Sequence, residues 1–317
     1  MTQGIIISLG SINADFQVRV DKDPYQTTTM IGHDLQRLGG GKGANVAYQA
    51  HLLGASATLI GRVGNDDLKE QALKPLREMD IDLTYVRAVD GASTAVSMIA
   101  VPPNGKKKII LAPNANDVWV EEDKDEVRKA ILQAPEGSVL VADYEVAPAI
   151  VEVAINAAQE KNFTVILDPS PTDRVDKRLF EKINYLIPDA SETEGLTGTA
   201  PASLEKAVSA AHKLLDQGVK NVLVKLEGGG CIAANKEITF HIPAIPVEVV
   251  DTTGAGDAFA GALAVAVMEK RPLKEAACFA SAASLVAVTG FGSQPAYASR
   301  ERVEHYFDLT IDKIEEI

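Results

Sequence analysis

One stretch decides how this chain is interpreted: DTTGAGDAF at residues 251–259. It follows a β-like run at residues 245–250, and it leads into a run of small apolar residues at 258–268 that predicts a helix. The first backbone N–H groups of a helix have no partner within the helix. Gly254, Ala255 and Gly256 carry almost no side chain, so an anion can reach those donors, and the helix dipole favours negative charge there.

Asp257 is the residue of this turn that needs an explanation. A carboxylate in the first helical turn gains from the helix dipole, but it would repel a phosphate bound in the same turn. An ordinary first-turn aspartate explains an isolated GAGD equally well. Our hypothesis is an anion hole with Asp257 as a catalytic base beside it. A Rossmann dinucleotide fingerprint is excluded because Phe259 stands where glycine is needed, and no GxxxxGK[ST] motif occurs.

The composition limits the partners of the chain. The net charge of −13 over 317 residues argues against a general surface for nucleic acid or anionic membranes. A phosphate site therefore has to be built locally. Cys231 and Cys278 lie in apolar settings, which indicates buried thiols rather than a disulfide. We expect a cytoplasmic protein, because no secretory signal is evident and the longest apolar segments are too short to span a membrane.

A second glycine-rich helix start lies at residues 39–45, with the sequence GGGKGAN. Helical spacing follows over residues 46–53. Glycines let a ligand approach the backbone closely, Lys42 supplies donors and a charge, and Asn45 offers both a donor and an acceptor. A ligand loop and a merely flexible loop are both consistent with this segment.

The first predicted strand, at residues 5–9, ends in GSINAD at residues 10–15. Ligands of α/β proteins bind at the carboxyl ends of such strands. Asn13 and Asp15 would face the same side of an extended chain, since side chains alternate along a strand. A polar turn after a strand explains this segment equally well.

From residue 139 onward strands and helices alternate, which predicts a parallel sheet covered by helices. Predicted strands are 57–60, 139–142, 164–167, 185–187 and 221–225, and predicted helices are 66–79, 147–159 and 203–216. The acids that follow the strands, and that should meet the two glycine-rich turns at one edge, are Asp143, Glu145, Asp168 and Asp189.

Two segments fall outside this alternation. Residues 94–101 and 108–112 are β-like and are joined by PPNG, which predicts a hairpin. With residues 13–38 the hairpin could form a small separate sheet that acts as a lid. The charged tail at residues 312–316 is expected to be a solvated helix face.

Taken together, these motifs resemble those of the ribokinase family of sugar kinases along nearly the whole chain. Residues 39–45 are similar to the first family signature, and residues 251–257 to the second, DTxGAGD. LDPSP at 167–171 resembles the family's LNPAP, and PDASE at 188–192 resembles its magnesium-linked PNxxE. The resemblance implies a single catalytic domain over residues 1–317. Its fold would be a Rossmann-like three-layer α/β sandwich with a mostly parallel central sheet and a β-lid formed by about 13–39 and 91–113.

The resemblance also implies an activity, which is transfer of the γ-phosphoryl group of ATP to a primary hydroxyl of a small sugar, above all O5 of ribose. Asp257 would be the base, and the amides of Gly254, Ala255 and Gly256 would hold the transferring group. Implied sugar-binding residues are Asn13, Asp15, Gly41, Lys42, Asn45, Glu145 and Asp257. Implied nucleotide-binding residues are Asp189, Lys225, Glu227, Gly228, Gly230, Gly256 and Ser281.

The same resemblance implies metal ions and a partner. Mg²⁺ would be held by Glu192 and Asp189, and a homodimer would form through the lid. A monovalent cation such as K⁺ would be held through carbonyls by the loop at residues 286–295, with Ala287, Gly290 and Gly292, together with Asp251 and Thr253.

Four positions depart from the family pattern. Asp189 replaces the usual Asn, Glu227 replaces a usual Gly, and Ala296 stands where a serine would offer its hydroxyl to the cation. Residues 20–38, in the lid that helps to choose the sugar, match poorly. Two alternatives therefore stay open. One is a kinase of another acceptor, such as a ketohexose, a deoxy sugar acid or a nucleoside, and the other is a sugar sensor without catalysis.

Overall fold

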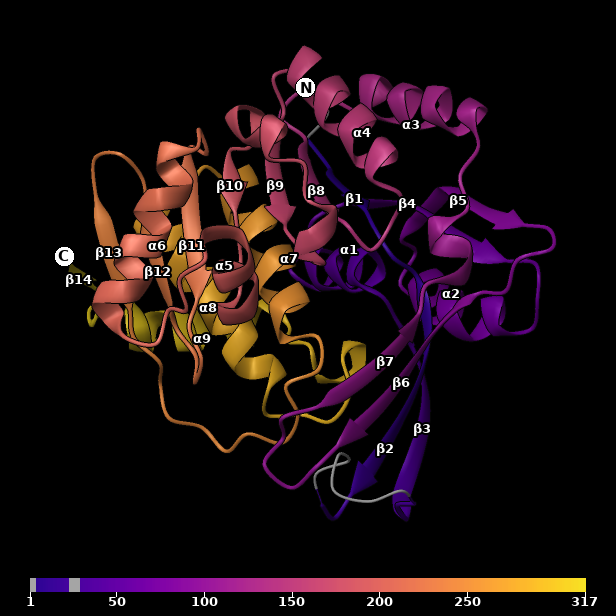
Figure 1. Cartoon of the computed structure of the whole chain (residues 1–317), viewed down its shortest axis with the longest axis horizontal. Helices are drawn as coiled ribbons and strands as arrows, with labels where there is room; N and C mark the ends of the chain where they lie inside the picture. Colours follow the sequence, from indigo (N-terminus) through magenta and orange to yellow (C-terminus); the bar gives the residue numbers. More distant parts are fainter. Residues whose placement is uncertain (1–3, 23–28) are drawn as a thin grey trace.

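The computed structural model describes residues 4–22 and 29–317, and it is a three-layer α/β sandwich with a small second sheet (Figure 1). The central sheet has ten strands in the order β14-β13-β12-β11-β10-β9-β8-β1-β4-β5. From β11 to β5 all neighbours run parallel. The other end, from β11 to β14, is antiparallel. This architecture confirms the fold class predicted from the sequence.

The parallel strands are mostly buried, as expected of a sheet that is covered by helices, except for the edge strand β5, whose residues are exposed or half-buried. They are β1 (Ile6–Leu9), β4 (Ala57–Gly64), β5 (Asp82–Val89), β8 (Val139–Asp143), β9 (Thr164–Asp168), β10 (Tyr185–Leu186) and β11 (Asn221–Lys225). The antiparallel strands are β12 (Cys231–Ala234), β13 (Thr239–Ile242) and β14 (Glu315–Glu316).

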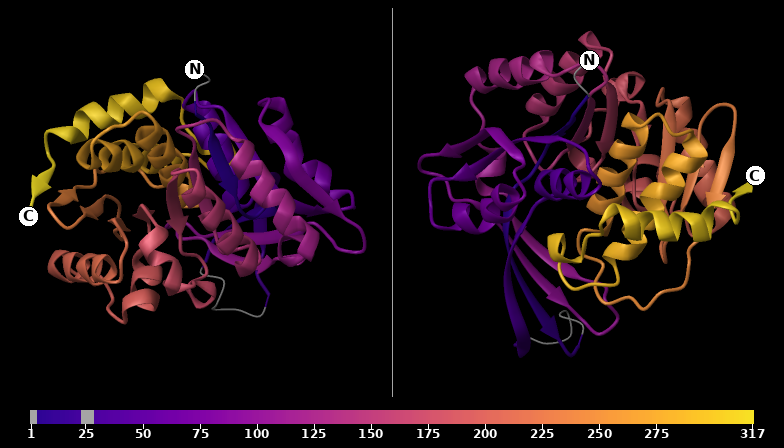
Figure 2. Two further views of the ribbon diagram at one scale, coloured as in Figure 1. Left: turned by 90° about the horizontal axis from the view of Figure 1, so that it is seen from above. Right: turned by 180° about the vertical axis from the view of Figure 1, so that it is seen from behind.

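Helices cover both faces of the sheet and build two apolar cores (Figure 2). One core is formed with α1 (Lys42–Leu52), α2 (Leu68–Glu78), α7 (Ala255–Met268), α8 (Leu273–Ala287) and α9 (Arg300–Ile311). The other core is formed with α3 (Glu121–Gln133), α4 (Pro148–Glu160), α5 (Ala190–Thr197) and α6 (Leu204–Asp216). Among the described residues, no helix has the length and the apolar character needed to cross a membrane.

Helix α7 is the most buried helix of the site region, and its small side chains explain how it fits there. Ala260, Ala262 and Ala264 have no exposed surface. At Gly261 an added Cβ would lie 2.9 Å from the carbonyl oxygen of Val46 in α1. Helices α1 and α7 therefore approach closely, which brings the two glycine-rich helix starts together.

The small sheet projects from the body of the molecule beside the carboxyl ends of the parallel strands (Figure 1). Its strands, in the order β3-β2-β6-β7, are β3 (Gly32–Gly40), β2 (Asn13–Val20), β6 (Ala95–Val101) and β7 (Lys108–Ala112). Strands β2 and β6 are parallel, and the other two pairs are antiparallel. The predicted hairpin is confirmed. The four strands fall within the segments predicted as a lid, except that β3 runs one residue further, to Gly40. Residues 23–28 of those segments lie outside the described residues, as do residues 1–3.

Two sequence predictions were wrong. Residues 245–250 form no strand, and Pro246, like Pro243 just before the run, lacks the N–H that a strand ladder requires. The charged tail is not a helix face, because α9 ends at Ile311 and Glu315–Glu316 pair with β13 as an edge strand. Charged side chains are common on edge strands, where they discourage further pairing.

Candidate active site

A cavity of about 700 Å³ lies between the small sheet, the N-terminus of α7 and the carboxyl ends of the parallel strands. Its volume is typical of small-molecule sites. All of the predicted sugar-binding residues line it, and so do all of the predicted nucleotide-binding residues except Glu227. Of the predicted monovalent-cation residues, Thr253 lines the cavity, whereas Asp251, Ala287, Gly290 and Gly292 do not.

The turn at the start of α7 depends on glycine. Gly254 is the N-cap and has a left-handed backbone with φ of 73°. An added Cβ there would lie 2.4 Å from the hydroxyl oxygen of Tyr297, which itself donates to the Gly254 carbonyl. Gly254, Ala255 and Gly256 line the cavity as predicted, although the Ala255 amide also makes a long hydrogen bond of 3.4 Å to the carbonyl of Thr252.

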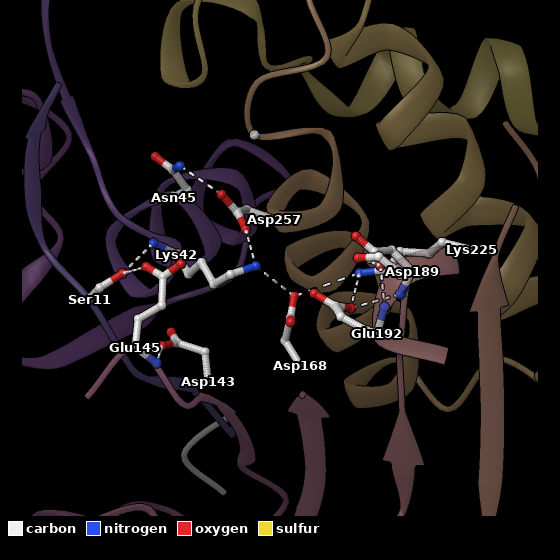
Figure 3. Close-up of polar contacts among 12 residues, drawn as sticks. Ser11, Lys42, Asn45, Asp143, Glu145, Asp168, Asp189, Glu192, Lys225 and Asp257 are labelled. Carbon is white, nitrogen blue, oxygen red and sulfur yellow. Dashed lines mark hydrogen bonds and ion pairs between the residues drawn. The ribbon is translucent and has the colours of Figure 1, made fainter. Parts of the chain in front are cut away.

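Asp257 lies in the first turn of α7 and is 8% exposed. The Nδ2 of Asn45 donates to its Oδ2 at 2.8 Å, and the Nζ of Lys42 lies 3.8 Å from its Oδ1 (Figure 3). Burial raises the pKa of Asp257 above its ordinary value, while the Lys42 ammonium and the Asn45 amide oppose that rise. The structure therefore brings a buried carboxylate, an ammonium and an amide from the two glycine-rich turns into contact.

Asp168, at the end of β9, is buried between Lys42 and Lys225. Its Oδ2 lies 3.2 Å from the Nζ of Lys42 and 3.7 Å from the Nζ of Lys225, which is 4.0 Å from the Oε2 of Glu192 (Figure 3). Burial raises the pKa of Asp168, but the ammonium groups of Lys225 and Lys42 outweigh burial and hold that pKa below its usual value. Sequence reasoning placed Asp168 at this edge without giving it a role.

The predicted sugar-binding side chains are held by hydrogen bonds from residues that sequence reasoning missed. Ser11 donates to the Oε2 of Glu145 at 2.6 Å, and the Lys42 amide donates to Ser11 at 2.8 Å. Asn116 donates to the Oδ1 of Asn13 at 2.8 Å. Ser11 belongs to the GSINAD segment and could have been noticed, whereas Asn116 lies in no motif.

Two further bonds complete this network. The Nδ2 of Asn13 donates to Ser97 at 3.1 Å, and the Nε2 of Gln294 donates to the Oδ1 of Asn45 at 3.1 Å. No sequence signal pointed to Ser97 of strand β6, and Gln294 lies in the loop that resembles the family's cation loop but was given no role at Asn45. Asn13, Asn45 and Glu145 are therefore held in place by their neighbours.

Burial raises the pKa of several acids near the predicted sugar-binding residues. Burial raises the pKa of Asp15 to about 7, and the Oδ1 of Asp15 is buried with no hydrogen-bond partner among the described residues. Burial also raises the pKa of Glu145 and that of Asp143, whose Oδ1 accepts from the Glu145 amide at 2.8 Å. A ligand that brings a hydroxyl donor would satisfy the unpartnered Oδ1 of Asp15.

The predicted magnesium ligands form a capping box at the start of α5. Asp189 is the N-cap and accepts from the amide of Glu192 at 2.8 Å, and Glu192 accepts from the amide of Asp189 at 2.7 Å. Burial raises the pKa of Glu192 to about 7. In the described part of the chain no three His, Cys, Asp or Glu residues gather to hold a metal. Two carboxylates still suit Mg²⁺, which commonly takes one or two of them together with water and substrate phosphates.

Glu227 pairs with a lysine of the small sheet rather than with Lys225. Its carboxylate lies 2.6 Å from the Nζ of Lys106, in the turn between β6 and β7, and both side chains are exposed. The same turn contacts the start of α7, because the Nζ of Lys107 donates to the carbonyl of Thr252 at 2.9 Å and the Thr252 hydroxyl donates to Gly105 at 3.0 Å. Burial lowers the pKa of Lys107. Sequence reasoning missed both lysines.

Asp251 has no exposed surface, and both of its carboxylate oxygens are occupied. Oδ1 accepts from the amide and the hydroxyl of Thr253 at 2.8 and 2.7 Å. Oδ2 accepts from the Nε2 of Gln17 at 2.5 Å and from the amide of Gly292 at 2.9 Å. Four donors leave this carboxylate no free lone pair, so the Asp251 side chain as arranged offers no ligand to a monovalent cation. The parts of Ala287, Gly290 and Gly292 in a cation site stay predictions.

Comparison with known proteins agrees with this geometry. Residues 5–300 match the family described as pfkB family carbohydrate kinase. The chain is 31% identical to a ribokinase of Haemophilus influenzae, covering 95% of this chain and 97% of the relative. It is 29% identical to a deoxyribokinase of Salmonella typhi, covering 96% and 99%.

A solved structure of Arabidopsis thaliana ribokinase complexed with ribose and ATP is similar throughout. It has a TM-score of 0.82 and 30% identity, over 96% of this chain and 99% of that chain. The chain therefore belongs to the pfkB family of carbohydrate kinases, and it is a ribokinase-type sugar kinase.

Proposed function

We propose that this chain transfers the γ-phosphoryl group of ATP to O5 of ribose. The observation that carries the proposal is Asp257. Its buried carboxylate stands in the first turn of α7, beside the amides of Gly254 and Gly256, and Asn45 and Lys42 hold it from the second glycine-rich turn. A base and a set of anion-binding amides at one end of one cavity are what phosphoryl transfer to an alcohol needs.

In the proposed reaction, Asp257 accepts the proton of the primary hydroxyl as the hydroxyl oxygen forms its bond to the γ-phosphorus. The bond from that phosphorus to the β–γ bridging oxygen breaks, and ADP leaves. Phosphoryl transfer relies on positioning and on stabilisation of charge. The amides of Gly254, Ala255 and Gly256 would stabilise the charge on the transferring group, with Lys42 close by.

The acceptor would lie in the half of the cavity next to the small sheet. Asn13, Asp15, Asn45 and Glu145 offer acceptors and donors for several hydroxyl groups. Ile99, Ile109 and Leu111 of the small sheet also line the cavity. They would exclude water, which otherwise competes with the sugar as the acceptor.

The nucleotide would lie in the other half, against Lys225, Gly228, Gly230, Gly256 and Ser281, all of which line the cavity. Glu227 would not repel the phosphates strongly, because Lys106 pairs with it. Glu192 and Asp189 would hold Mg²⁺, which neutralises phosphate charge when bound.

Deoxyribose is the second candidate acceptor, because the chain is 29% identical to a deoxyribokinase over nearly its whole length. Deoxyribose lacks the 2-hydroxyl of ribose. The site would discriminate against deoxyribose if one of its buried polar groups binds that hydroxyl and is left unpaired without it. Asp15, with its unpartnered oxygen, is such a group.

The test is ADP release from Mg-ATP with a panel of sugars, including ribose, deoxyribose, fructose, tagatose, deoxygluconate and pseudouridine. We expect turnover with ribose to exceed turnover with every other sugar. Higher turnover with deoxyribose than with ribose would mean that deoxyribose is the acceptor, while the sugar kinase activity would stand. Sugar binding without ADP release from any member of the panel would contradict the proposal and favour a sensor.

We also propose that two copies of the chain associate through their small sheets. Met98 and Ile110 are opposite each other on β6 and β7, and they are 60% and 72% exposed. Adjacent exposed apolar side chains on a sheet favour burial against a partner. Sedimentation of the wild type and of Ile110→Lys tests this, and a monomeric wild type would refute it.

A further inference from the structure

Gln17 connects the small sheet to the segment that precedes the anion-binding turn. It lies in β2 and has no exposed surface. Its Nε2 donates to the Oδ2 of Asp251 at 2.5 Å, across 234 positions of sequence. Gln17 is the donor to Asp251 that comes from the small sheet, whereas Thr253 and Gly292 belong to the body of the molecule.

A carboxylate with no exposed surface is stable only if its charge is balanced or fully hydrogen-bonded. At Asp251 the second condition is met, since each oxygen accepts two hydrogen bonds. Hydrogen bonds to a charged group are stronger than neutral ones. The Nε2 of Gln17 thus supplies one of the two donors to Oδ2, while the Oε1 of Gln17 is buried with no hydrogen-bond partner among the described residues.

We propose that Gln17 replaces a monovalent cation at Asp251 and makes the anion-binding turn independent of K⁺. Asp251 fixes Thr253 through two hydrogen bonds, and Thr253 is followed directly by Gly254. Holding Asp251 in place therefore holds the start of α7 in place. Gln17 is a positioning residue, because it acts through Asp251 and does not itself line the cavity.

Removal of the Gln17 side chain should reopen a cation site. The carboxylate of Asp251 would lose one donor, and a buried space would be left beside it. The Oγ of Ser293, next to Gly292, is buried and has no hydrogen-bond partner among the described residues. Carboxylate, hydroxyl and carbonyl oxygens are the ligands that hard cations prefer.

The first experiment is thermal unfolding of the substrate-free protein in potassium chloride and in tetramethylammonium chloride at equal ionic strength. We expect the same Tm for the wild type in both salts. Gln17→Ala should lose roughly 3–8 °C in tetramethylammonium and regain most of that loss in potassium. Gln17→Met, which fills the space without a donor, should lose stability in both salts. Gln36→Ala, opposite Gln17 in the same sheet, is the control and should respond to neither salt.

The second readout is turnover, which rests on the proposed function. The ratio of kcat in potassium to kcat in tetramethylammonium should be near one for the wild type and should rise in Gln17→Ala. A wild type that potassium stabilises and activates, with both effects lost in Gln17→Ala, would overturn the inference and make Gln17 a cation ligand. The unfolding experiment needs no sugar. If the protein were inactive on every sugar, the proposed function would be refuted, and the Tm values alone would still test whether Gln17 replaces the cation.

Discussion

The two halves of the cavity are built differently. On the acceptor half, Asn13, Asp15 and Asn45 are 4%, 3% and 4% exposed, and neighbouring side chains fix Asn13 and Asn45. On the nucleotide half, Glu227 is 76% exposed at its side chain, and the three residues after it are glycines. The proposed acceptor half is lined by buried side chains, whereas the proposed nucleotide half combines the largely buried Lys225 and Glu192 with consecutive glycines, and the exposed Glu227 lies outside the cavity lining.

This difference indicates where discrimination between substrates takes place. Sugars differ from one another in the direction of single hydroxyl groups, which only fixed, desolvated partners can distinguish. The phosphates of a nucleotide are satisfied by backbone amides and ammonium groups with less directional demand. Substitutions in the acceptor half should therefore cost far more than substitutions in the nucleotide half.

The largest effect on kcat is expected for Asp257, which lies where the two halves of the cavity meet. Asp257→Asn keeps the shape and the hydrogen-bonding capacity of the side chain but removes the base, so kcat should fall by about 10²–10⁴-fold. The fold should be retained, as measured by an unchanged far-UV circular dichroism spectrum. Turnover within a few-fold of the wild type would remove Asp257 from the role of base.

Asp15→Asn should weaken the acceptor half while leaving the nucleotide half unchanged. Loss of a charged hydrogen bond to a sugar hydroxyl should lower kcat/KM for ribose by roughly 10–100-fold, with little change in the KM for ATP. Steady-state kinetics with each substrate varied in turn measures the split. Equal losses for sugar and ATP would contradict the division of the cavity.

The same substitution should stabilise the protein without its sugar. The pKa of Asp15 is about 7 in the folded protein and near 4 when unfolded. Between these values the folded state holds a proton that the unfolded state has lost, so this group makes stability fall as pH rises from about 4 to 7. An asparagine does not titrate, so Asp15→Asn lacks this loss of stability at high pH. The Tm of the variant minus the Tm of the wild type should therefore be larger at pH 8 than at pH 5. A Tm difference that does not change with pH would contradict this.

Lys42→Met should change the pH dependence of the reaction. Burial raises the pKa of Asp257 and the Lys42 ammonium lowers it, so loss of the ammonium should raise that pKa further. Because the base must be ionised, the acid limb of log kcat against pH should move to higher pH. Lys206→Met, on the exposed start of α6, is a matched control that should leave the limb unchanged. A limb that stays in place or moves to lower pH would contradict the coupling.

The smallest effect is expected on the nucleotide half. Lys106 and Glu227 form an exposed pair, and such pairs contribute about 0–1 kcal/mol. Glu227→Ala and Lys106→Ala should therefore change the KM for ATP by less than about fivefold. A double-mutant cycle measures the coupling between them, with Lys74→Ala, from another exposed pair, as the control. A loss above tenfold in Glu227→Ala alone would mean that this half is more specific than its exposure suggests.

Local pattern was enough to predict the layers, the glycine-rich turns and the acids at the strand ends, because each depends on spacing within a few residues. The partners of these residues could not be predicted. Asn116 is 103 positions from Asn13, and Gln294 is 249 positions from Asn45. Such pairs exist only because the parallel strands and the small sheet meet at one edge, and no periodicity encodes that meeting. The failure at residues 245–250 was different, since an apolar run was given more weight than its prolines.

The connections of the small sheet have a consequence for how a sugar leaves. The chain passes from β1, in the middle of the central sheet, into β2 through residues 10–12, and it returns from β3 into α1 through Gly41. These joints carry or adjoin Ser11, Asn13 and Lys42, which belong to the acceptor half. A swing of the sheet would bend the chain beside residues that would bind the acceptor, as well as at residues 90–94 and 113, which also join the sheet to the body. Movement of the small sheet and release of the sugar would then occur together. A bound sugar would oppose the movement of the sheet that releases it.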